Sequence, residues 1–260
     1  MLRYSGFMRR REFFQLSAAS LAAGYLKALE PTGSSIIDRF IDVTGGKAAY
    51  AKLVTEVAEG TVNMGAQGVS GTVKVLKKSG NAYTVIEIAG VGKLEEGVRQ
   101  GVAWENNKIT GARVRTGEER DVQVRNAAID LEHQWRKYFV TADLAGSETI
   151  AGEDCHKVVL KPKTGEPEIR YFSKKTGLML KMTGVMPTQM GPMPMESTMS
   201  DYREVQGLKR PFKLGVSAGG QAAEMTFTKY TINAPVPDSA FALPAEVVSL
   251  VPKVASKPAK

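Results

Sequence analysis

The sequence contains few of the residues that most often form disulfides or hold metals. Among 260 residues there are one cysteine, Cys155, and two histidines, His133 and His156. A single cysteine cannot form a disulfide within the chain, and two histidines leave few combinations for a metal site. We therefore expect no metal centre and no cofactor.

Recognisable catalytic motifs are also missing. Gly90-Val91-Gly92-Lys93 resembles part of a phosphate-binding loop, but Glu87 stands at the first glycine position and Leu94 replaces the required serine or threonine. Glu132-His133 lacks the second histidine of a zinc-protease helix. Cys155-His156 lies in an expected strand, where neighbouring side chains point to opposite faces, so the two cannot easily pair. We expect a buried structural cysteine and no enzymatic activity.

Long apolar runs and clusters of charge are absent as well. No apolar segment has the length of a transmembrane helix, so we expect no transmembrane anchor. The net charge is +8, and the first 27 residues hold five basic residues against one acidic residue. The remaining positive charge is scattered, which argues against nucleic acid as a partner. A weak preference for anionic lipid headgroups stays open.

The N-terminus resembles a twin-arginine export signal. Arg10 and Arg11 form the arginine pair, Phe13 and Phe14 fill the apolar positions, and a modest apolar run follows. We predict a signal peptide over residues 1–30 and a soluble protein of the periplasm or cell envelope. Tyr25 stands where a lipid-modified cysteine would be, which argues against a lipid anchor. The alternative is an amphipathic cytoplasmic helix with a basic start.

The periodicity of the remaining chain predicts a mainly β protein of the α+β kind. Apolar residues at helical spacing predict a helix over 34–43 and a second over 47–54, separated by Gly45-Gly46. From Val57 the period changes to two, and turn residues recur at hairpin spacing. We predict about eleven strands in one largely antiparallel sheet, with helices covering one of its faces.

A further helix is predicted over residues 120–140. Its apolar stripe carries five residues at spacings of three or four: Ala127, Ala128, Leu131, Trp135 and Phe139. The stripe faces either the core or, through a gap between helix and sheet, an apolar ligand. Leu131, Trp135 and Phe139 are the residues that we select as candidate ligand contacts.

Methionine is concentrated in one segment rich in proline and glycine. Six of the 11 methionines lie there, at positions 182, 186, 190, 193, 195 and 199. The prolines and glycines predict a loop between two strands. Three interpretations stay open: adaptable contacts at the lip of a lipid cavity, soft ligands for Cu(I), or an apolar loop folded against the protein. We select Met186, Met190, Met193 and Met195 as candidate ligand contacts.

Several segments together resemble the LolA/LolB/LppX-like superfamily of outer-membrane lipoprotein-sorting proteins. They are 40–60, with Thr44-Gly45-Gly46-Lys47 at its centre, 152–160, 171–178, 201–213 and 237–241. The resemblance spans roughly residues 35–244 and rests on turns and strand ends. It implies a curved antiparallel half-barrel with helices plugging the concave side, and a gap between them that holds acyl chains or other apolar ligands.

These expectations define two hypotheses. The first is a non-catalytic envelope protein that binds or carries a lipid or acyl chain, with residues 31–246 forming the half-barrel and residues 247–260 a flexible tail. The alternative is a structural or sensory module of the same fold that binds an envelope protein partner.

Overall fold

The computed structural model describes residues 30–65, 68–108 and 110–251. Contacts divide the chain into two units, residues 1–32 and residues 33–260. The expected export signal, with Arg10, Arg11, Phe13 and Phe14, lies outside the described residues. Most of the expected tail, residues 252–260, lies outside them too. In the part of the chain that is described, no helix is both long and apolar enough to cross a membrane.

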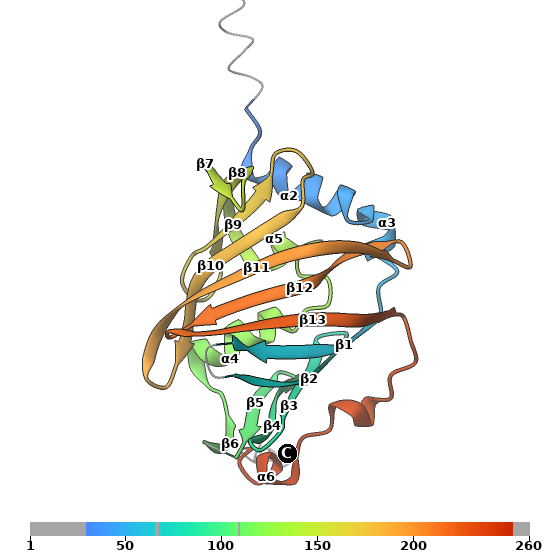
Figure 1. Cartoon of the computed structure of the whole chain (residues 1–260), viewed down its shortest axis with the longest axis vertical. Helices are drawn as coiled ribbons and strands as arrows, with labels where there is room; N and C mark the ends of the chain where they lie inside the picture. Colours follow the sequence, from blue (N-terminus) through green and yellow to red (C-terminus); the bar gives the residue numbers. More distant parts are fainter. Residues whose placement is uncertain (1–29, 66–67, 109, 252–260) are drawn as a thin grey trace, which may run out of the picture. The chain divides into compact units, whose positions relative to one another are not determined.

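The second unit contains one open antiparallel sheet of thirteen strands (Figure 1). In chain order the strands are β1 (Thr55–Met64), β2 (Val69–Lys78), β3 (Asn81–Ile88), β4 (Gly92–Arg99), β5 (Val102–Asn107), β6 (Gly111–Val114), β7 (Phe139–Ile150), β8 (Glu153–Pro162), β9 (Glu168–Ser173), β10 (Met179–Thr188), β11 (Gly191–Val205), β12 (Leu208–Ala218) and β13 (Gln221–Ile232). The antiparallel sheet is confirmed, but the expected number of eleven strands was too low. The expectation also assigned a loop where β10 and β11 form a hairpin.

The strand order is a meander with one long-range closure. The sheet runs β6-β5-β4-β3-β2-β1-β13-β12-β11-β10-β9-β8-β7. Every neighbouring pair is consecutive in the chain except β1 and β13, which meet in the middle, where Glu56 pairs with Ile232. Hairpins therefore form both halves of the sheet, and the last strand joins them.

Helix α2 (Gly33–Val43) fills the face of the sheet near β7 and β8. Its apolar residues at helical spacing, Ile36, Ile37, Phe40 and Ile41, are all buried. The Phe40 ring lies against that of Phe172 on β9, with centroids 5.6 Å apart. The predicted helix over 34–43 is thus confirmed. The second helix is shorter than predicted: α3 (Gly46–Tyr50) ends in a turn before Val54.

The predicted helix over 120–140 is interrupted. Helix α4 (Gly117–Asn126) ends near Ala127, turns follow, and only α5 (Trp135–Tyr138) resumes helical structure before β7 begins at Phe139. All five residues of the predicted stripe are nonetheless buried. Isolated bonds such as Ala128 N to Arg125 O and Gln134 N to Asp130 O satisfy the turns locally. A buried stripe at this spacing does not distinguish a continuous helix from a chain of helical turns.

The methionine-rich segment is a β-hairpin. Met186 pairs with Met193, Pro187 with Pro192, and Thr188 with Gly191 around a two-residue turn. The prolines are compatible with this ladder because β12 pairs with β11 only from Met195 onward. Pro192 and Pro194 thus lie where no flanking strand needs their missing N–H. The expectation of a loop was wrong for this reason.

The chain ends against the sheet. The one-turn helix η3 (Asp238–Phe241) places the Phe241 side chain against Leu76 and Val236. Helix α6 (Ala245–Val248) contacts β5 and β6 and buries Val247 completely.

Candidate functional site

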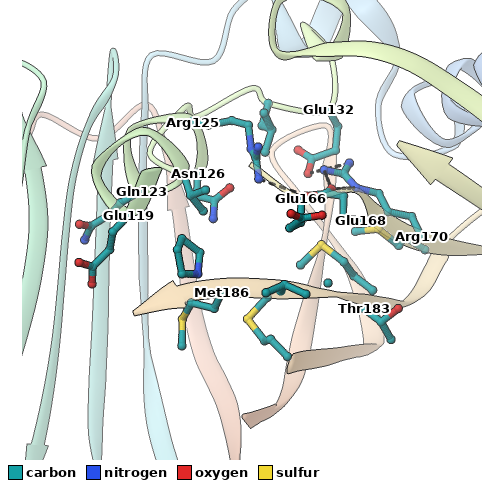
Figure 2. Close-up of a pocket in the computed structure, with 18 of the residues that line it drawn as sticks. Glu119, Gln123, Arg125, Asn126, Glu132, Glu166, Glu168, Arg170, Thr183 and Met186 are labelled. Carbon is teal, nitrogen blue, oxygen red and sulfur yellow. Dashed lines mark hydrogen bonds and ion pairs between the residues drawn. The ribbon is translucent and has the colours of Figure 1, made fainter. Parts of the chain in front are cut away.

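A cavity of about 370 Å³ lies between β10, β11 and helix α4. This volume is within the range of small-molecule sites, roughly 300–1,000 Å³. Figure 2 shows Met186 on one side of the cavity and Glu119, Gln123 and Asn126 of α4 on the other. The cavity therefore has one wall of strands and one wall of polar helix.

The strand wall consists of thioethers. Five methionines line it: Met179, Met182 and Met186 on β10, and Met195 and Met199 on β11. Gly184 pairs directly with Met195, so Met182 and Met186 lie diagonally on either side of Met195 on one face of the hairpin. Because glycine has no side chain, it leaves space at the centre of this group. Long, unbranched and polarisable side chains around a gap form an apolar surface that can change shape.

The start of α4 is anchored by ion pairs to the neighbouring strands. Arg113 of β6 donates hydrogen bonds to Glu119 of α4 and, at 2.6 Å, to Glu105 of β5. Arg115 follows, with its Nη2 2.6 Å from Glu105 and 2.9 Å from Glu96. Burial alone would raise the pKa of Glu105, but the hydrogen bonds from Arg113 and Arg115 outweigh it and hold that pKa below its ordinary value. Glu105 therefore stays charged at neutral pH.

The end of α4 is held on the opposite side of the cavity. Arg125 donates a hydrogen bond to the Thr164 carbonyl at 3.0 Å and lies 3.4 Å from Glu168 of β9. Val122 and Glu118 of the same helix approach Gly165 in the adjacent loop. Helix α4 thus connects β5 and β6, at one edge of the sheet, with the β8–β9 region beyond the cavity.

A buried charge cluster closes the inner end of the cavity. Arg170 is 2% exposed and donates hydrogen bonds to Glu168 at 2.7 Å, while Glu132 lies 3.8 Å from its Nη1 atom. The centroid of the Phe139 ring lies 5.2 Å from the guanidinium carbon of Arg125 and 5.2 Å from that of Arg170. A buried arginine that keeps its carboxylate partners makes this end rigid and polar.

The structure places the sequence-selected residues in three environments. Leu131, Met186 and Met195 line the cavity together. Trp135 and Phe139 lie in the main core, at 5% and 2% exposure, and do not line it. Met190 is 90% exposed in the hairpin turn, and Met193 packs against Gly219 in the next hairpin.

Sequence reasoning missed most of the polar lining. Arg115, Glu119, Arg125 and Glu168 come from segments with no shared motif, and only the fold brings them together. The thioether wall did leave a signal. Met182 and Met186 before the turn, and Met195 and Met199 after it, are each separated by an even number of residues, which is the spacing of one face of a strand. The prolines between them concealed this pattern.

The nucleophilic and metal-binding side chains do not gather around the cavity. Cys155 is fully buried beside Ile150 and Tyr171, and burial raises the pKa of its thiol. His133 stacks on Tyr50 outside the cavity lining. Among the described residues, no group of three or more histidine, cysteine or acidic side chains is placed to hold a metal ion.

The fold is similar to that of solved structures. No protein-family model and no curated protein matches the sequence. A LolA superfamily protein from Nitrosomonas europaea aligns with a TM-score of 0.55 and 14% identity, covering 82% of this chain and 99% of that one. The fold of this chain is therefore similar to that of this LolA superfamily protein. A DUF1329 family protein from Desulfovibrio piger aligns similarly, with a TM-score of 0.54, 15% identity, and coverage of 80% and 96%.

This likeness in fold confirms the resemblance seen in the sequence. At these identities the likeness establishes how the chain folds, and fold alone does not assign a ligand. The function therefore has to be argued from the cavity of this chain.

Proposed function

We propose that this protein is a non-catalytic binding or carrier protein of the cell envelope. Its ligand is an apolar or amphipathic molecule, such as a lipid or an acyl chain, held in the methionine-lined cavity. The observation that carries the proposal is the cavity itself, which five thioethers and Leu131 line on a sheet of LolA-superfamily type. The twin-arginine route remains our proposal for how the chain reaches the envelope.

The two walls suit an amphipathic ligand better than a purely apolar one. Methylene groups would lie against the methionines of β10 and β11, where each buried methylene contributes about 0.8 kcal/mol. Polar groups would lie against α4 and the Arg125–Glu168 end of the cavity. In this proposal α4 and α2 cover the concave side of a half-barrel, and α2 fills its part while α4 leaves room for ligand.

Filling the cavity tests the proposal directly. Gly184 has no left-handed backbone angle, and a Cβ added there meets only the Cβ and Cα atoms of Glu168, at ordinary contacts of 3.4 and 3.8 Å. Gly184→Leu should therefore fold and occupy the space between Met182, Met186 and Met195. Ser200→Leu, on the exposed face of β11, adds the same side chain outside the cavity and is the matched control.

Uptake of a soluble fluorescent fatty acid, followed by its emission, measures binding. We expect the wild type and Ser200→Leu to bind it, and Gly184→Leu to lose at least about tenfold in affinity, since steric exclusion removes more than one methylene of burial. Equal binding by Gly184→Leu, with the fold intact by circular dichroism, would place the ligand elsewhere. Absence of binding by the wild type would remove the carrier proposal and favour the protein-interaction alternative.

A further inference from the structure

At one end of the sheet, four of the six hairpin turns carry no charged residue. The turns between β3 and β4, β1 and β2, β12 and β13, and β10 and β11 all lie at one end, because these strands are neighbours in an antiparallel order. We call this end the turn rim. Its described residues are 60–65, 68–73, 88–92, 182–195 and 214–223, and these stretches contain no aspartate, glutamate, lysine or arginine. The turn rim is thus a continuous uncharged edge over eight adjacent strands.

The opposite end carries charge at every hairpin turn. Lys77 and Lys78 stand at the β2–β3 turn, and Arg99 precedes the β4–β5 turn. The β7–β8, β9–β10 and β11–β12 turns are similarly flanked by acidic or basic residues. Because both ends are made of the same kind of hairpin, the lack of charge is a property of the turn rim and not of turns in this fold.

Within the turn rim, the β10–β11 hairpin projects furthest from its neighbours. Pairing with β9 ends at Thr183, and pairing with β12 begins at Met195. Residues 184–194 therefore pair only with each other and form an arm. Figure 1 shows this hairpin extending past the ends of the adjacent strands. Its tip residue Met190 is 90% exposed, and Val185 is exposed as well.

The chemistry of the arm indicates what covers it. Two open strand edges would ordinarily attract another strand, but Pro187, Pro192 and Pro194 remove N–H donors from these edges. A partner strand, including one from a second copy of the chain, would lack those hydrogen bonds. A surface that makes apolar contacts and needs no hydrogen bonds from the protein can cover the arm despite the missing N–H donors.

The position of the arm and the residues that border the turn rim also favour a membrane surface as the partner. The arm is continuous with the cavity, since Val185, Met186 and Pro187 line it from the base of the hairpin. The two other hairpin turns at this end carry charge: Lys108 is exposed after β5, and Lys163 and Glu166 are both exposed after β8. An uncharged centre bordered by exposed charged residues matches an apolar membrane interface with charged headgroups around it.

We propose that the turn rim, led by the β10–β11 arm, docks on the lipid–water interface of a bilayer. Met190 and Val91 enter the headgroup boundary, while the unpaired backbone carbonyls of the arm keep it from sinking into the hydrocarbon. The inference rests on the proposed function in one respect: docking places the opening of the cavity next to the bilayer, which is the source of an apolar ligand.

Flotation with vesicles of phosphatidylethanolamine and phosphatidylglycerol tests the docking. Met190→Glu places a charge at the tip of the arm, at a position too exposed to affect folding. Val54→Glu makes the same change at an exposed valine just before β1, at the other end of the sheet. We expect wild type and Val54→Glu to float with the vesicles and Met190→Glu to lose roughly tenfold in partitioning, because about one side chain's worth of apolar burial is lost.

Three outcomes would overturn the proposal. They are wild-type protein that does not float, equal partitioning of Met190→Glu, and equal losses in Met190→Glu and Val54→Glu. Wild-type protein that instead forms a dimer sensitive to Met190→Glu would assign the rim to a second copy.

Failure of this inference is separable from failure of the proposed function. Gly184→Leu should lose uptake of the soluble fatty acid and still float with vesicles. Met190→Glu should show the reverse pattern. A protein that floats but takes up no fatty acid would keep the docking surface and remove the carrier function.

Discussion

Helices α2 and α4 have nearly the same length and pack against the same sheet in opposite ways. Helix α2, of 11 residues, buries Ile36, Ile37, Phe40 and Ile41. Helix α4, of 10 residues, has no fully buried residue and no apolar face. The first is held by apolar packing, and the second is held by ion pairs at its two ends. The cavity lies under α4 because a helix without an apolar face leaves the sheet beneath it unfilled.

This difference indicates which of the two helices can move away from the sheet. Removing α2 from the sheet would expose the main core, which includes Phe172 and Leu160. Moving α4 would break half-buried ion pairs whose partners can be solvated by water. Segments with few buried apolar contacts open at lower free energy than the global unfolding transition. We therefore expect α4 to move without disturbing the rest of the fold.

The largest expected effect is on global stability. Ile37→Ala removes a fully buried side chain from α2 and should lower the free energy of unfolding by about 2–5 kcal/mol. Val122→Ala on α4 borders the cavity and should cost less than about 1 kcal/mol, because it opens no new void. Urea unfolding measures both. Similar losses in the two variants would show that the helices are packed alike.

A smaller effect is expected from releasing the start of α4. Glu119→Gln weakens the contacts with Arg113 and Arg115, and amide exchange over 117–126 should accelerate by roughly tenfold, since hydrogen bonds between charged groups contribute about 1.5–3 kcal/mol. Exchange in α2 should not change. Glu118→Gln, at the exposed neighbouring position, is the control. Acceleration in both helices would mean that they open together.

The smallest effect is a dependence on pH. The pKa of Glu105 lies below the ordinary value of 4.5, so its contribution to the α4 anchor is complete above that pH and is lost as pH falls through the lowered pKa. Protection of α4 amides, corrected for intrinsic exchange, should fall in acid before that of α2. Glu105→Gln should remove this early loss. A parallel decline of both helices in the wild type would contradict the assignment.

The sequence predicted the parts of the fold in which one kind of periodicity dominates. Helix α2 was predicted over 34–43 because its apolar spacing is regular, and most hairpins followed from alternating strands and turn residues. The break after Asn126 could not be predicted, because the buried stripe from Ala127 to Phe139 keeps its helical spacing through the turns. The methionine hairpin was missed because prolines normally exclude strands, and only the register shows that no neighbour needs their N–H groups.

The candidate site was predictable only in part. Leu131, Met186 and Met195 were selected for their apolar character, and they do line one cavity. The charged lining depends on pairs such as Arg125 with Glu168 and Arg113 with Glu119, and their sequence positions carry no signal of proximity. Trp135 was selected on the same grounds as Leu131, but the interrupted helix turns its side chain into the core.

The position of β13 in the middle of the sheet has a consequence for how the chain is made. During synthesis the strands β1 to β12 emerge first and can form two separate sets of hairpins, but β1 cannot pair on its open side until β13 has left the ribosome. The open edge of β1 must therefore wait, unpaired, while β2 to β12 are synthesised, and the edge of β12 waits only until the next strand follows. A nascent chain that stalls before residue 221 should expose both edges and be a substrate for chaperones rather than a shortened protein.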